Sequence, residues 1–77
     1  MKRLPLTQMK TGQKGKVVAI NAGLDLQNRL LSQGIYVGRE ITKLSHFALR
    51  GPVTIKVGRT VMALGYGMAH KITVELE

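Results

Sequence analysis

The chain has 77 residues, a length that holds one small domain and leaves no room for a second core. Hydrophobic residues make up 44% of it, which favours a globular fold over a disordered tail. It contains no cysteine, which excludes a disulfide framework, a thiolate zinc site and an iron–sulfur cluster. Lysine and arginine outnumber the acids 12 to 4, and the formal net charge of +8 points toward an acidic partner or surface.

The beginning of the chain carries no export signal. Lys2 and Arg3 resemble the start of a signal peptide, but Pro5 and Lys10 interrupt any apolar stretch after them. No apolar run approaches the roughly 20 residues that a membrane-spanning helix needs. We therefore expect a cytoplasmic protein with no membrane span of its own.

The first third of the chain predicts a helical turn, a reversal and a strand. Leu6 and Met9 have the i, i+3 spacing of a single helical turn. Two glycines within Thr11–Gly15 predict a tight turn. The short β-branched segment Lys16–Ile20 predicts a strand.

One amphipathic helix follows that strand. Asn21 or Asp25 is the predicted N-cap, and Gly34 is predicted to end the helix in a left-handed conformation. At 100° per residue, four leucines fall within an arc of about 160°: Leu24, Leu26, Leu30 and Leu31. We expect this arc to dock on an apolar surface.

After the helix the apolar period changes from 3.6 to 2, which indicates strands. Gly38 predicts a turn with a positive φ, and Gly58-Arg59 predicts a two-residue hairpin. Gly65–His70 is expected to form an irregular or one-turn helical connection. The predicted strands are about Glu40–Phe47, Val53–Val57, Thr60–Leu64 and Ile72–Leu76.

Together these elements predict one mainly β domain over residues 1–77. About five short strands, with one amphipathic helix inserted after the first, leave too many exposed edges for a flat sheet. Curling into a small barrel of the SH3 or OB type removes that problem. The fold expected is therefore an SH3-like β-barrel.

The residues do not assemble a catalytic site, and we expect no enzyme activity and no cofactor. Ser45 and His46 are neighbours on a predicted strand, so their side chains point to opposite faces. Asp25 opens the helix, while Glu75 and Glu77 lie on the solvent-facing positions of the last strand.

Two other classes of site are weighed and not preferred. His46 and His70 are the only weak metal candidates, able to meet across the barrel with Met68, but a structural zinc site needs four ligands. The sequence predicts a basic, solvated surface to which Lys14, Lys43 and Lys56 contribute, and binding of RNA or DNA by this surface stays open as the alternative function. One observation opposes nucleic-acid binding: the three aromatic residues are too dispersed along the chain to form a platform on which bases could stack. They are Tyr36, Phe47 and Tyr66.

The order of weak motifs along the chain resembles the ferrous-iron transport protein A (FeoA) family from about Leu4 to Leu76. The first part is Leu6-x-x-Met9-x-x-Gly12, a strand, and Arg29-Leu30-x-x-x-Gly34-Ile35-x-x-Gly38-x-x-Ile41. The second part is Gly51-Pro52-x-x-Ile55-x-Val57-Gly58 and Val61-Met62-Ala63-Leu64-Gly65-x-Gly67-Met68-Ala69-x-x-Ile72-x-Val74. Val37 stands where that family commonly has proline, and Arg50-Gly51-Pro52 replaces a frequent Gly-Asp-Pro.

The resemblance implies an SH3-like barrel that acts as a cytoplasmic accessory to the ferrous-iron permease FeoB. Family members are thought to contact the cytoplasmic part of that permease, which carries its GTP-binding domain. A weak homo-oligomer also stays open. The partner-binding residues we predict, from residue type and from their place at the helix exit or in the last connection, are Arg29, Tyr36, Val37, Tyr66 and Met68.

Overall fold

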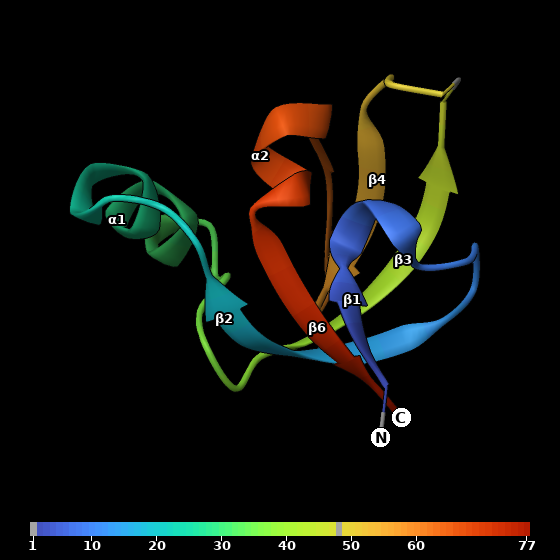
Figure 1. Cartoon of the computed structure of the whole chain (residues 1–77), viewed down its shortest axis with the longest axis horizontal. Helices are drawn as coiled ribbons and strands as arrows, with labels where there is room; N and C mark the ends of the chain where they lie inside the picture. Colours follow the sequence, from blue (N-terminus) through green and yellow to red (C-terminus); the bar gives the residue numbers. More distant parts are fainter. Residues whose placement is uncertain (1, 48) are drawn as a thin grey trace.

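A computed structural model describes residues 2–47 and 49–77, which form one antiparallel sheet with inserted helices (Figure 1). The strands lie in the order β1-β6-β2-β3-β4-β5. The strands are β1 (Arg3–Pro5), β2 (Lys14–Ile20), β3 (Glu40–His46), β4 (Val53–Val57), β5 (Thr60–Leu64) and β6 (Ile72–Leu76). The helices are the 3₁₀ turn η1 (Leu6–Gln8), α1 (Leu24–Ser32) and α2 (Tyr66–His70).

The sheet curls around a single apolar core, and the predicted mainly β, SH3-like fold is confirmed. It has six strands instead of about five, and β1 and β5 are its two edges, so the sheet is curled without being closed. None of the described helices is long and apolar enough to cross a membrane. The buried core side chains are Leu4, Leu6, Met9, Val17, Leu30, Ile35, Ile41, Val53, Ile55, Val57, Leu64, Ala69, Ile72 and Val74.

The N-terminal part of the sheet differs from the prediction in two ways. The three-residue strand β1 was not predicted, because so short a segment ending in Pro5 shows no alternation; it pairs with β6. Strand β2 begins at Lys14, within the segment predicted to be a turn. Gly15 pairs with Leu76 of β6, and a Cβ at Gly15 would come within 3.1 Å of the Cβ of Val74 on that strand. Gly15 therefore serves close packing and not a chain reversal.

The C-terminal end of α1 matches the prediction and its N-terminal end does not. Gly34 has a φ of +87°, and its N–H donates to the carbonyl of Leu31, while the N–H of Ile35 donates to that of Leu30. These two bonds form a Schellman motif, in which buried Ile35 and Leu30 supply the apolar contact. The predicted N-cap, Asn21 or Asp25, is wrong. The cap is Gly23, without a side-chain hydrogen bond, and Asp25 lies in the first turn.

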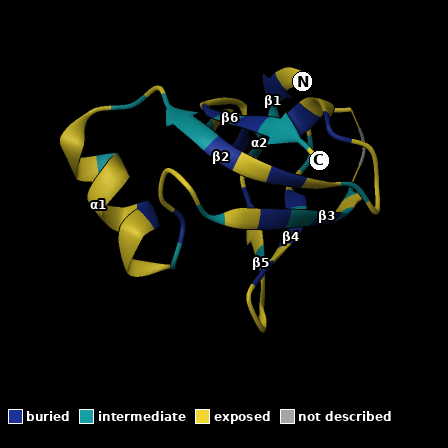
Figure 2. Cartoon of the chain, turned by 90° about the horizontal axis from the view of Figure 1, so that it is seen from below, coloured by how far each residue is buried: buried dark blue, intermediate teal, exposed yellow. Residues whose placement is uncertain are grey.

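The leucine arc of α1 divides into two faces. Leu30 is fully buried and Leu26 packs against the core. Leu24 and Leu31, by contrast, are 72% and 56% exposed. Figure 2 shows α1 standing to one side of the sheet with most of its surface exposed. The core of the chain therefore supplies the expected apolar surface for Leu26 and Leu30 only.

Strand β3 carries the largest exception to the predicted basic surface. Lys43, placed among the exposed cations by the sequence, is 2% exposed. Its ammonium donates to the backbone carbonyls of Thr7 within η1 (3.0 Å) and of Met9 directly after it (2.7 Å). Its Nζ also lies 3.1 Å from Nδ1 of His46. A register shift between Lys43 and Ser45 brings Lys43 and His46 to the same end of the core.

The remaining predicted elements are confirmed. Strands β4, β5 and β6 have the predicted bounds. Strand β3 begins at Glu40 as predicted and ends at His46, one residue early. Gly58 has a φ of +60° in the two-residue hairpin between β4 and β5. The single-turn helices η1 and α2 lie in the two segments where a helical turn was expected.

We predict that Lys43→Met lowers the free energy of unfolding by about 1–3 kcal/mol, because two buried carbonyls lose their donor while the aliphatic packing is retained. Lys56→Met is the matched control, since Lys56 is exposed on the neighbouring strand and its loss should change stability by less than about 0.5 kcal/mol. Urea denaturation measures both. Equal stabilities of the two variants would contradict this assignment.

The same lysine gives a pH dependence of stability. Burial lowers the pKa of Lys43 below 10.5, so the unfolded chain binds this proton more tightly than the folded chain does. Stability contributed by this group therefore rises with pH between the lowered pKa and 10.5. Denaturation at a series of alkaline pH values should show a more positive slope for the wild type than for Lys43→Met, and parallel slopes would contradict it.

Candidate functional site

The turn that leads from α1 into β3 positions the candidate site. The N–H of Arg39 donates to the carbonyl of Tyr36 (3.0 Å), and Gly38, two residues after Tyr36, has a φ of +100°. This is the arrangement of a type II turn. Val17 of β2 holds it in place: its carbonyl accepts from the N–H of Gly38 (2.7 Å), and its N–H donates to the carbonyl of Arg39 (2.9 Å). Val37, the second residue of this turn, is 61% exposed.

A small apolar depression lies on the α1 side of this turn. We call it the α1 notch; its volume is about 130 Å³. Leu24, Leu31 and Val37 are exposed around it. These side chains gain nothing from the core, so they are available to a partner. The notch is lined by Ile20, Leu24, Gln27, Asn28, Leu31, Ile35, Tyr36 and Val37.

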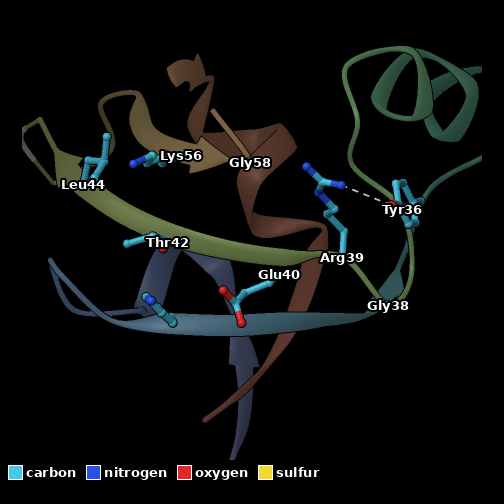
Figure 3. A pocket seen from close by; sticks show the side chains of 9 residues that line it. Tyr36, Gly38, Arg39, Glu40, Thr42, Leu44, Lys56 and Gly58 are labelled. Atoms are coloured by element: carbon cyan, nitrogen blue, oxygen red, sulfur yellow. Dashed lines mark hydrogen bonds between the residues drawn. The ribbon is translucent and has the colours of Figure 1, made fainter. Parts of the chain in front are cut away.

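A wider groove lies on the other side of Tyr36. We call it the β3 groove; its volume is about 610 Å³ (Figure 3). Tyr36 lines both the groove and the notch, so the two surfaces adjoin. The groove is lined by Lys14, Tyr36, Gly38, Arg39, Glu40, Thr42, Leu44, Lys56 and Gly58.

Arg39 is held in one orientation at the end of the groove. Its Nη1 donates to the hydroxyl of Tyr36 (3.3 Å), and its guanidinium carbon lies 5.8 Å from the centre of that ring. Its Nη2 lies against the hairpin at Gly58, where a Cβ would approach it to 2.5 Å. The absence of a side chain at Gly58 thus makes room for the guanidinium.

The charges around the groove are unequal. Lys14, Arg39 and Lys56 line it, with Glu40 as the single acid among the lining residues. The carboxyl of Glu40 lies beside Glu77, and hydrogen bonding between them, with burial and mutual repulsion, raises the pKa of Glu77. The one ion pair in the described part of the chain joins Arg3 and Glu75, elsewhere on the sheet. The groove is therefore a cationic surface.

The two histidines do not meet. Tyr66 stands between them, with its ring centre 6.1 Å from that of His46 and 5.8 Å from that of His70. The Nδ1 of His70 lies 3.0 Å from the hydroxyl of Thr7, which is buried and so out of reach of a substrate. Among residues 2–47 and 49–77, no three His, Asp or Glu side chains cluster as metal ligands would. Nε2 of His46 is buried without a hydrogen-bond partner there.

The five predicted partner residues lie in separate places. Tyr36 and Val37 border the notch. Arg29 is exposed on α1 and is not among the notch residues. Tyr66 and Met68 belong to α2, where both are half-buried and Met68 packs against the core. The role of all five in partner binding stays a prediction.

Sequence reasoning missed most of the residues that build the two surfaces. Leu24 and Leu31 were placed in one apolar arc with Leu26 and Leu30, although Gln27, which falls between the two pairs on the helix, is the signal that divides them. Lys14 and Lys56 were noted only as members of a basic surface. Their alignment on either side of Thr42 depends on strand register, which cannot be derived from the sequence alone.

A curled six-stranded sheet with a helix inserted between its second and third strands places the chain among the small SH3-like β domains. Residues 4–76 match the FeoA domain, and the chain belongs to the FeoA family. The resemblance predicted from the sequence is thus confirmed. A provisionally named Fe(2+) transport protein A of Methanocaldococcus jannaschii is 37% identical over 71 residues, covering 92% of this chain and 84% of that protein. One of Campylobacter jejuni is 29% identical, covering 95% and 99%.

Solved structures agree with this assignment. The crystal structure of an iron uptake regulatory protein (FeoA) superposes with a TM-score of 0.89 at 34% identity, covering 100% of both chains. A manganese-dependent transcriptional repressor shares the fold, with a TM-score of 0.86 at 20% identity. It covers 97% of this chain but only 42% of the repressor. The fold therefore also occurs as one part of larger proteins.

Neighbouring leucines on α1 should differ sharply in their effect on stability. We predict that Leu30→Ala lowers the free energy of unfolding by about 2–4 kcal/mol, because Leu30 is fully buried. Leu31→Ala has the same helix propensity change and should cost less than about 0.5 kcal/mol. Thermal or urea unfolding measures the difference. A comparable loss in both variants would mean that the notch residues serve the fold.

Proposed function

We propose that this chain is a cytoplasmic accessory protein of ferrous iron transport that docks on the cytoplasmic GTP-binding part of an FeoB-type permease and modulates it. Membership of the FeoA family supports this function, as do relatives named Fe(2+) transport protein A. The observation that carries the docking surface is the exposed apolar face of α1 and the adjoining turn.

The energetics favour the α1 notch as the contact surface. Fully burying a leucine or valine side chain contributes about 1.5–3 kcal/mol relative to leaving it exposed. Leu24, Leu31 and Val37 are each more than half exposed, so most of that gain is still available to a partner. Tyr36, 41% exposed, adds an aromatic side chain of the kind enriched at interface centres.

The rigid frame beneath these side chains supports the same role. The Schellman motif fixes the end of α1, and the bonds from Val17 fix the turn that follows. A surface held by backbone hydrogen bonds loses little conformational entropy when it binds. The notch therefore has the two properties of a docking site, unused apolar area and a fixed shape.

We predict that Leu24→Asp weakens binding to the cytoplasmic domain of the permease by about tenfold or more, because a charge enters the apolar contact. Asp is well tolerated at this first helical position, so the fold should be unaffected. Leu49→Asp is the control, a leucine that is also mostly exposed and lies in the connection between β3 and β4, away from the notch. Calorimetry or biolayer interferometry without nucleotide, with GDP and with a GTP analogue measures the affinities.

The outcomes separate the function from the surface. Loss of binding in Leu24→Asp but not in Leu49→Asp supports both the docking function and the notch as its surface. Equal binding of the wild type and both variants would retain the docking function and reject the notch. No binding of the wild type in any nucleotide state would overturn the proposed function itself.

A further inference from the structure

We infer that the β3 groove binds an acidic peptide segment of the partner, and that an apolar side chain of the same segment enters the α1 notch. This inference rests on the proposed docking function and deepens it by naming the chemistry of the recognised segment. It is carried by strand register, by the fixed position of Arg39 and by the charges around the groove.

Strand register places two lysines on one row of the sheet. Lys14 of β2 faces Thr42 of β3, and Thr42 faces Lys56 of β4. Residues directly opposite one another in neighbouring strands project from the same face. Adjacent strands lie about 4.8 Å apart, so the two lysines stand about 10 Å apart across the groove. That separation leaves room for an extended chain between them.

Arg39 supplies the third cation and is already oriented. Its contacts with Tyr36 and with the hairpin at Gly58 restrict the rotamers that a free arginine would sample. Ordering a long side chain on binding costs conformational entropy, and here that cost is largely met in the free protein. A guanidinium held in this way suits a carboxylate, which it can bind through two parallel hydrogen bonds.

The three cations of the groove are free of salt bridges within the described chain. Arg3 is the one basic residue paired there with a carboxylate. Glu40, the single acid that lines the groove, and Glu77, which lies beside it and near Lys14, offset only part of the positive charge. An incoming row of carboxylates would therefore meet unpaired cations, which favours association and speeds encounter.

A protein segment fits this groove better than a nucleic acid or a second copy of the chain. Tyr36 is the single aromatic side chain that lines the groove, and the guanidinium of Arg39 lies over its ring, so bases have no stacking platform. A second copy would bring another net charge of +8 to a cationic surface. An acidic segment satisfies the charge, and Tyr36, shared by both surfaces, leads directly to the notch.

The first test uses a synthetic peptide with one leucine followed by four glutamates, titrated into the ¹⁵N-labelled full chain. We expect the amide signals of Lys14, Arg39, Thr42 and Lys56 to shift, together with those of Leu31 and Val37. Replacing the leucine by serine should abolish the shifts at the notch and retain those at the groove. Absence of groove shifts with either acidic peptide would overturn the inference.

Charge-reversal variants separate the groove from the net charge. Lys14→Glu combined with Lys56→Glu should weaken peptide binding by about tenfold, since two attractions become repulsions. Lys10→Glu combined with Lys71→Glu changes the net charge equally, at exposed lysines outside the groove, and should weaken it by less than threefold. Equal loss in the two double variants would reduce the effect to overall charge and reject a groove site.

Two further arms decide between partners. A mixed-sequence single-stranded oligonucleotide that binds at the groove more tightly than the acidic peptide would overturn the inference in favour of nucleic acid. The second arm measures binding to the permease domain. If Leu24→Asp weakens this binding and the double variant Lys14→Glu with Lys56→Glu does not, the groove inference is overturned and the docking function is retained. If Leu24→Asp and the double lysine variant each weaken binding, the docking function and the groove inference are both supported.

Discussion

Both candidate surfaces depend on two hydrogen bonds made by the backbone of Val17. Its carbonyl accepts from the N–H of Gly38 and its N–H donates to the carbonyl of Arg39, and together these bonds hold the turn between α1 and β3. Because Val17 is itself fully buried in β2, the turn is fixed to the centre of the sheet. Tyr36 is consequently held between the notch and the groove, whereas in an unanchored loop it could move. The relative position of the two surfaces is a property of the sheet.

A buried lysine holds the opposite end of the fold together. The edge strand β1 is three residues long, too short to be secured by its ladder alone. The turn η1 that follows it leaves backbone carbonyls inside the domain, and the ammonium of Lys43 satisfies those of Thr7 and Met9. A chain of this size has few apolar residues to spare. One long side chain here supplies both aliphatic packing and three possible donors.

The elements governed by local chemistry could be predicted, and the residues placed by register and packing could not. Gly34, Gly38 and Gly58 each adopt the positive φ that their local motifs predict. Gly15 has the same side chain and was misassigned, because the neighbouring strand β6, whose Val74 leaves no room for a Cβ there, is some 60 positions away. Lys43 was missed for the same reason: its partners Thr7 and Met9 are 36 and 34 residues distant along the chain.

The candidate site shows the same division, and α1 explains why. Tyr36 and Val37 were predicted from residue type and from their place at the helix exit, and both border the notch. Leu24 and Leu31 were grouped with Leu26 and Leu30 in one docking arc, because hydrophobic periodicity reports how wide an apolar stripe is and not how much of it the fold buries. The curled sheet covers only the Leu26 and Leu30 side of that stripe. When the apolar arc of a helix is wider than the core beneath it can cover, the uncovered part indicates a docking surface. The sequence shows the width of the arc, but the covered part is known only from the size and curvature of the sheet.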